Sequence, residues 1–360
     1  MSGMFGNNIK VSIFGESHGA AIGLTIDGLP SGFPIDLEKV NIEMERRAPG
    51  RNSLSTARKE GDNVEILSGL FNGKTTGTPL CGIIKNSDKK SKDYSKLKDL
   101  MRPGHADYTG NLRYDGFNDY RGGGHFSGRI TAPIVFGGAL CKQVLESYGI
   151  KIVSHIKQIG NIKDEFFNPV EIDEDLIEEL PKRVLPLLNE YLEDSMKEEI
   201  LRAKKDGDSV GGIIECAIVN AMSGIGDPFF DSVESTLSHL LFSVPAVKGV
   251  EFGEGFNIAN LKGSNANDEF YYEGDEVKTR TNNNGGILGG ITNGMPIIFR
   301  VVIKPTASIL KVQQTINISD KTNCDLQIEG RHDPCIVQRA VPVIEACAAI
   351  GILELLKGRK

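Results

Sequence analysis

The sequence lacks both a long uncharged apolar segment and a closely spaced cysteine pair. No run of 18 uncharged apolar residues occurs among its 360 residues, so we expect no membrane-spanning helix. Its six cysteines are scattered without a C-x-x-C pair, which argues against a disulfide framework and a structural zinc site. The first ten residues lack the charged and then apolar pattern of a signal peptide. These features predict a reduced, cytoplasmic protein with no metal and no membrane partner.

Acidic residues outnumber basic ones, 48 to 41, and glycine is abundant. The formal net charge of −7 predicts no overall attraction to nucleic acid, so any anionic ligand must be held by local basic clusters. Glycine accounts for 42 of 360 residues, well above the usual share of roughly 7%. Because glycine permits sharp turns and close approach to a ligand, its frequent position beside polar residues indicates binding loops.

The pattern of apolar residues predicts a mixture of strands and helices. The alternating, β-branched run 9–14 predicts a strand, and further strands are predicted at 22–26, 64–67, 80–84 and 297–303. Helical periodicity follows Asp36, a predicted N-cap, and recurs at about 130–147, 231–244 and 341–356. Asp231 and Glu234 are spaced as a capping box. The elements do not alternate as in βαβ units, so the predicted class is α+β, with one large or two interlocked domains.

One acidic segment differs in composition from the rest of the chain. Residues from about 165 to 206 show a helical pattern at Leu188, Leu192, Met196 and Ile200. We interpret this segment as a helical surface insertion rather than a site.

Gly15-Glu16-Ser17-His18-Gly19 fits the G-x-S-x-G pattern of a hydrolase nucleophile elbow. That elbow leads into a helix, whereas a strand is predicted here, and a triad histidine comes from elsewhere in the fold. A hairpin turn without chemistry is a second interpretation. A third is that His18 donates a proton, since histidine changes charge near neutral pH.

Two glycine-containing segments resemble nucleotide-binding motifs only in part. Gly73-Lys74-Thr75 is preceded by serine, not glycine, at the position that a P-loop requires. The segment 285–290 does not match G-x-G-x-x-G. Neither motif therefore predicts a nucleotide site.

Many arginines lie in or beside glycine-containing loops. Arginine binds carboxylate or phosphate in a bidentate fork, so several arginines around one cavity would bind a multiply anionic small molecule. A single arginine is more often solvated surface. The candidates are Arg46, Arg47, Arg51, Arg102, Arg121, Arg129, Arg331 and Arg339.

Neither Asp333 nor His105 can be assigned a structural or a catalytic role from its own position in the sequence. Asp333 lies between His332 and Pro334, so it fits either a helix N-cap with proline at the first position or a catalytic carboxylate. His105 stands in a segment with three later glycines, Gly122 to Gly124, which predict a loop.

Three motifs together resemble those of the chorismate synthase family, in the family's order. They are Gly15-Glu16-Ser17-His18-Gly19, the block from Arg102 to Gly124, and Arg331-His332-Asp333-Pro334-Cys335. The resemblance extends over nearly the whole chain. It implies a single domain of residues 1–360 in which helices pack between antiparallel sheets, and assembly as a homotetramer.

The resemblance also implies an activity. The family converts 5-enolpyruvylshikimate 3-phosphate to chorismate by 1,4-anti elimination of phosphate, and requires reduced FMN without net redox change. NADPH is the reductant of flavin in some members. By this resemblance His18 protonates the departing phosphate, His105 holds a proton near the reduced flavin, and Asp333 relays the proton from flavin N5.

The same resemblance assigns the remaining site residues. The substrate-binding residues are Ser17, Arg46, Arg47, Arg51, Arg102, Arg129 and Arg339. The cofactor-binding residues are Arg47, His125, Phe126, Ser127, Ala246, Gly289, Lys304, Pro305, Thr306, Ala307, Ser308 and Arg331. The chain departs from many members at His125, where they have arginine, and at Ile130 and Pro245.

Overall fold

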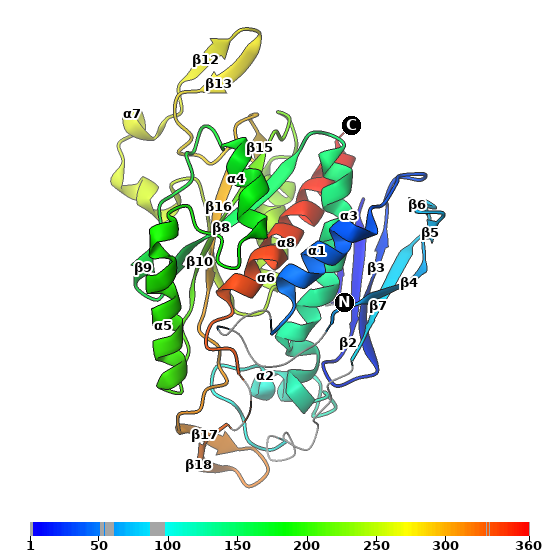
Figure 1. Cartoon of the computed structure of the whole chain (residues 1–360), viewed down its shortest axis with the longest axis vertical. Helices are drawn as coiled ribbons and strands as arrows, with labels where there is room; N and C mark the ends of the chain where they lie inside the picture. The colour runs from blue at the N-terminus through cyan, green and yellow to red at the C-terminus, as the bar shows by residue number, and fades with distance from the viewer. Residues whose placement is uncertain are drawn as a thin grey trace.

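A layer of long helices lies between two antiparallel sheets (Figure 1). The computed structural model describes residues 3–50, 54, 61–86, 98–328, 330 and 332–359. This arrangement agrees with the predicted α+β sandwich.

The first sheet has the strand order β1-β2-β3-β7-β4. Its strands are β1 (Met4–Phe5), β2 (Lys10–Gly15), β3 (Ala21–Asp27), β7 (Leu80–Lys85) and β4 (Val64–Ser68). The four strands predicted in this region are confirmed to within one or two residues. Ile22, Leu24 and Ile26 alternate along β3 and are fully buried, because one face of the sheet packs on the helices.

The second sheet has the order β11-β16-β10-β8-β9. Its strands are β11 (Val247–Phe252), β16 (Ile297–Ile303), β10 (Gly212–Val219), β8 (Lys151–Ile159) and β9 (Ile162–Lys163). All neighbouring pairs are antiparallel, and β16 occupies the predicted range.

The helix layer consists of α1 (Leu37–Arg47), α3 (Thr131–Glu146), α6 (Val233–Ser243) and α8 (Val337–Gly358). Helices α3 and α8 are buried along most of their length since the sheets cover both sides of the layer. They cross closely at Gly138, where a Cβ atom would lie 2.2 Å from the Cβ of Ala346. Small residues at this crossing therefore let the two helices approach.

The helix starts test the predicted caps. Asp36 caps α1 as predicted, since its carboxylate accepts from the backbone N–H groups of Glu38 and Lys39. The capping box predicted at Asp231 is wrong, because Ser232 is the N-cap of α6 and Asp231 belongs to the preceding 3-10 turn. The N-cap interpretation of Asp333 is also wrong, because α8 begins only at Val337.

The acidic segment connects β8–β9 to β10 and contains α4 (Glu174–Glu179) and α5 (Glu193–Lys205). Its predicted helix begins later than expected, so Leu188 and Leu192 precede it, whereas Met196 and Ile200 are fully buried on its inner face. Helix α5 lies on the outer side of the second sheet (Figure 1).

The remaining elements are short. They are β5 (Leu70–Phe71), β6 (Lys74–Thr75), α2 (Asp107–Arg113), α7 (Gly263–Ala266), β12 (Phe270–Glu273), β13 (Glu276–Thr279), β14 (Ile287–Leu288), β15 (Ile291–Thr292), β17 (Gln313–Asn317) and β18 (Thr322–Leu326). The hairpins β12–β13 and β17–β18 project at opposite ends of the molecule (Figure 1).

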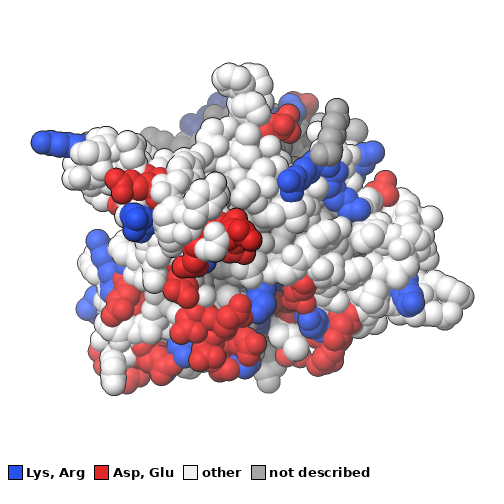
Figure 2. Space-filling model, turned by 90° about the horizontal axis from the view of Figure 1, so that it is seen from above, with Lys and Arg blue, Asp and Glu red and all other residues white. Residues whose placement is uncertain are grey.

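Acidic and basic side chains are unevenly distributed on the surface. Seen from above, acidic side chains gather in the lower half of the view, and lysines and arginines form smaller groups (Figure 2). Within the described residues, every helix is too short or too polar to cross a membrane.

Candidate active site

A cavity of about 770 Å³ lies where segments distant in sequence meet. Its walls come from strands β1 and β2, the end of α1, the segments 102–106 and 122–134, the residues joining α6 to β11, the segment 304–308 after β16, and the start of α8. A cavity of this size is typical of small-molecule sites.

Most of the predicted site residues line this cavity. They are Arg47, Arg102, His105, His125, Phe126, Ser127, Arg129, Ala246, Lys304, Pro305, Thr306, Ala307, Ser308, Asp333 and Arg339. Ser17 and His18 are buried against Gly122, which itself lines the cavity. Arg51 and Arg331 lie outside the described residues.

The charged lining is strongly cationic. Among the described residues that line the cavity, six are lysine or arginine and one, Asp333, is a carboxylate. The six are Arg47, Arg102, Arg129, Lys248, Lys304 and Arg339. Burial lowers the pKa of Lys304, and the nearby charge of Lys248 lowers it further. Such a cavity favours a ligand with several negative charges.

Two of these arginines share a buried counter-ion. Arg47 Nη1 donates to Asp62 Oδ2 at 2.6 Å, and Arg129 Nη1 donates to Asp62 Oδ1. Burial, followed by the charges of Arg339 and Arg129, lowers the pKa of Arg47 to about 10, although Asp62 opposes this shift. The site therefore carries more buried positive charge than its own carboxylates balance.

Asp333 is held at the cavity wall by the start of α8. Arg339 Nη1 donates to Asp333 Oδ2 at 2.5 Å, and Arg339 Nε donates to the carbonyl of Arg47 at 3.1 Å. Arg339 therefore links the carboxylate of Asp333 to the end of α1.

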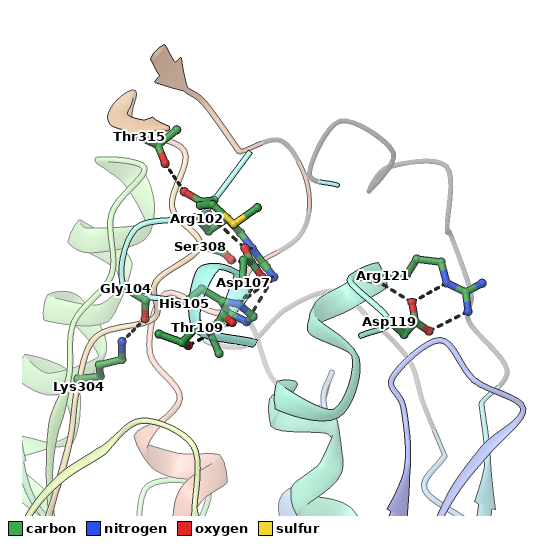
Figure 3. Close-up of polar contacts among 12 residues, drawn as sticks. Arg102, Gly104, His105, Asp107, Thr109, Asp119, Arg121, Lys304, Ser308 and Thr315 are labelled. Carbon is green, nitrogen blue, oxygen red and sulfur yellow. Dashed lines mark hydrogen bonds and ion pairs between the residues drawn. The ribbon is translucent and has the colours of Figure 1, made fainter. Parts of the chain in front are cut away.

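Arg102, His105 and Asp107 point toward one another (Figure 3). Asp107 Oδ2 accepts from Arg102 Nε at 2.7 Å, and Asp107 Oδ1 pairs with His105 Nδ1 at 2.6 Å. Burial alone would raise the pKa of Asp107, but hydrogen bonds from Arg102 and His105 outweigh it and hold the pKa well below its usual range. The ionised carboxylate thus orients the imidazole.

The other end of this network is fixed by the segment after β16. Ser308 Oγ accepts from Arg102 Nη1 at 3.3 Å, and Lys304 Nζ donates to the carbonyl of Gly104 (Figure 3). Arg121 lies on the opposite side of the view in Figure 3, pairs with Asp119 at 2.8 Å and is not among the lining residues.

The three consecutive glycines form the irregular loop that was predicted, and they pack against both histidines. A Cβ on Gly122 would lie 2.2 Å from His18 Cε1, and one on Gly123 would lie 3.0 Å from His105 Cε1. Both glycines have positive φ, +59° and +84°. The backbone N–H of Ser17 also donates to the carbonyl of Gly124 at 3.1 Å. The loop therefore joins the first motif to the second.

Comparisons with known proteins agree with this geometry. The profile of the family described as "Chorismate synthase" matches residues 9–356. A chorismate synthase of Methanocaldococcus jannaschii is 46% identical over 98% of this chain and 95% of its own length. One of Thermococcus kodakarensis is 43% identical over 99% of this chain and 98% of its own. A crystal structure of a chorismate synthase superposes with a TM-score of 0.76 at 28% identity, covering 98% of this chain and 92% of that one.

The chain belongs to the chorismate synthase family. The family, the α+β class and the activity predicted from the sequence are thereby confirmed. The structure also argues against the hydrolase interpretation, because Gly19 is followed by strand β3, whereas a nucleophile elbow leads into a helix.

Besides Ser17 and His18, two further predicted site residues among those described, Arg46 and Gly289, do not line the cavity. Arg46 points among α1, α3 and α8, where its guanidinium pairs with Glu345 at 2.6 Å and Glu43 at 2.9 Å. Gly289 lies in the turn between β14 and β15. Their assignment to ligand binding stays a prediction.

His125, where many family members have arginine, is tied to the first sheet. Its Nδ1 pairs with the carbonyl of Gly15 at 2.8 Å. The next residue, Phe126, packs beside Tyr114, with ring centroids 6.2 Å apart, and both line the cavity. These rings give one part of the cavity an aromatic wall.

Sequence reasoning missed Asp62 and Asp107. Asp107 follows His105 within the Arg102 block, so its position two residues from a candidate catalytic histidine was the available signal. Asp62 has no such neighbour among the motifs, and only the fold brings it to Arg47 and Arg129.

Proposed function

We propose that the cavity binds 5-enolpyruvylshikimate 3-phosphate with reduced FMN and eliminates phosphate to give chorismate without net redox change. The cationic lining carries this proposal: among the described residues, six lysines or arginines and one carboxylate line the cavity. The substrate bears two carboxylates and a phosphate, which are groups that arginine binds in bidentate fashion.

The described residues fit a flavin. Phe126 and Tyr114 supply an aromatic wall, and the segment 304–308 adds a backbone loop with a lysine suited to a phosphate. Bound reduced FMN would supply electron density to the breaking bond and a proton acceptor at N5.

The chain's own residues would then manage protons and orientation. Asp333, which pairs with Arg339, would relay the proton from flavin N5, and His105, which pairs with Asp107, would hold a proton near the flavin. His18 would protonate the departing phosphate, with Ser17 beside it, from behind the glycine loop. Arg47, Arg102, Arg129 and Arg339 would bind the substrate's anionic groups.

We further infer properties that accompany this activity in the family. The chain would work as a single domain in a cytoplasmic homotetramer, without a nucleic-acid or membrane partner. NADPH is our candidate reductant for the flavin. Arg46, Arg51, Gly289 and Arg331 are retained as candidate ligand-binding residues.

One anaerobic assay tests the proposal. The protein is mixed with chemically reduced FMN and 5-enolpyruvylshikimate 3-phosphate, and chorismate absorbance and phosphate release are followed together. Equal formation of both products, lost when oxidised FMN replaces reduced FMN, is the expected result. A folded protein that binds flavin and forms neither product would overturn the proposal and favour a flavin-binding module.

A further inference from the structure

Asp62 occupies an unusual position behind the cavity wall. It lies just before β4, is 3% exposed, and has a positive φ of +37°, which is uncommon for a residue with a side chain. It does not itself line the cavity, whereas Arg47 and Arg129 do. Asp62 is therefore placed to act on a ligand only through these two arginines.

Each carboxylate oxygen of Asp62 serves a different guanidinium. Oδ2 accepts from Arg47 Nη1 at 2.6 Å, and Oδ1 accepts from Arg129 Nη1. Further acceptors fix the remaining geometry of the pair: Arg47 Nε donates to Thr131 Oγ1 at 3.2 Å, and Arg129 Nε donates to Asn86 Oδ1 at 3.2 Å. The arginines are thus oriented before any ligand binds.

The electrostatics of the site require such a counter-ion. Arg47 and Arg129 are both buried, and two buried like charges would separate or recruit water without a carboxylate between them. Burial alone would raise the pKa of Asp62, but the charges of Arg47 and Arg129 outweigh it and lower the pKa. Asp62 stays ionised at neutral pH for this reason.

We propose that Asp62 is a positioning residue that holds Arg47 and Arg129 at the cavity wall in the arrangement that binds the anionic substrate. This role rests on the proposed function. The proposal concerns the placement of the arginines and not merely the total charge of the site. Removing the carboxylate of Asp62 would weaken substrate binding if placement matters, and would strengthen it if only total charge matters.

The test uses Asp62→Asn in the full-length protein. The dissociation constant of 5-enolpyruvylshikimate 3-phosphate is measured by calorimetry with oxidised FMN present. Loss of a negative charge alone would tighten the binding of an anion, whereas misplaced arginines weaken it. We expect binding weaker by on the order of 10- to 100-fold, together with a raised KM. Unchanged or tighter binding would overturn the proposal.

Asp62→Glu separates position from charge and also serves if the asparagine variant does not fold. It keeps the carboxylate but lengthens the side chain, so both oxygens no longer reach the two guanidiniums from the same place. Weaker substrate binding supports the positioning role, and wild-type affinity refutes it.

Glu215→Gln is the matched control for lost stability. Glu215 is 1% exposed and pairs with Arg300 at 3.2 Å and His155 at 2.9 Å on the second sheet, and it does not line the cavity. The control is expected to lower the melting temperature and leave substrate affinity unchanged. If Glu215→Gln and Asp62→Asn lost substrate affinity equally, general destabilisation would explain the effect and the positioning role of Asp62 would be refuted.

The wild-type assay separates the two proposals. Chorismate formation by the wild type with unaltered affinity in the Asp62 variants would overturn only the role of Asp62. Absence of chorismate formation and of substrate binding in the folded wild type would overturn both.

Discussion

Gly122→Ala should displace a candidate catalytic histidine without changing any chemical group. The new Cβ would lie 2.2 Å from His18 Cε1 and 3.1 Å from Ser17 Oγ, whereas carbon atoms in contact are about 3.5–4.0 Å apart. The histidine or the loop must therefore move by about 1 Å or more. A displacement of that size at a reacting centre lowers the rate by about 100-fold.

Backbone strain must be separated from this displacement, since Gly122 has a φ of +59°. An alanine in this left-handed region costs about 1 kcal/mol of folding stability. Gly32→Ala is the matched control, because Gly32 has a φ of +74° and its Cβ would meet nothing within 4 Å. Gly32→Ala therefore introduces the backbone strain of a positive φ without a steric clash.

The assay compares kcat for chorismate formation, with reduced FMN, in the two variants and the wild type. Thermal unfolding is recorded in parallel. We expect both variants to lose a little stability and only Gly122→Ala to lose most of its kcat. Equal kcat values in the two variants would refute the argument that the loop positions His18.

Three further predictions concern stability and catalysis. Burial alone would raise the pKa of Glu345, but Arg46 and Lys142 outweigh it and lower the pKa, so this carboxylate stabilises the fold above pH about 4.5. Glu345→Gln should lower the free energy of unfolding by about 3–5 kcal/mol at pH 7. Chemical denaturation should show that the difference between wild type and variant shrinks below pH about 4.5, and a difference that is constant with pH would contradict this. Gly138→Ala should lower the free energy of unfolding by about 1–3 kcal/mol in the same measurement, because α3 and α8 would have to separate. A variant as stable as the wild type would argue against close packing at this crossing. Asp333→Asn should lower kcat by about 100-fold or more with little change in KM, and steady-state kinetics in which only KM changed would contradict a role in proton transfer.

The sequence alone determined the family, the class, the four long helices, four strands of the first sheet and β16, whereas β8, β10 and β11 were not predicted. Strand β3 was predictable because the apolar residues Ile22, Leu24 and Ile26 recur on one face at the period of a strand. The cap at Asp36 was predictable because capping depends on atoms two or three residues away. The family was evident because its binding loops use residue types, such as three adjacent glycines beside histidine, that ordinary folding seldom requires.

Local pattern was insufficient where neighbouring residues compete. Asp231 and Ser232 are both suitable caps, and the 3-10 turn before α6 decided in favour of serine. Asp333 precedes a proline and fits a helix start, yet its carboxylate pairs with Arg339 and α8 begins later. In both cases the motif alone did not identify the residue at which the helix begins.

Only the tertiary structure decided which charges share the cavity. Arg47 and Arg339 are joined through the end of α1 and the start of α8, and Asp62 reaches Arg47 and Arg129 from before β4. No periodicity encodes these meetings, because they follow from burying the apolar faces of both sheets against one helix layer. The same packing turned Arg46, adjacent to Arg47 in sequence, toward Glu345 instead of the cavity, since successive helix residues point in different directions.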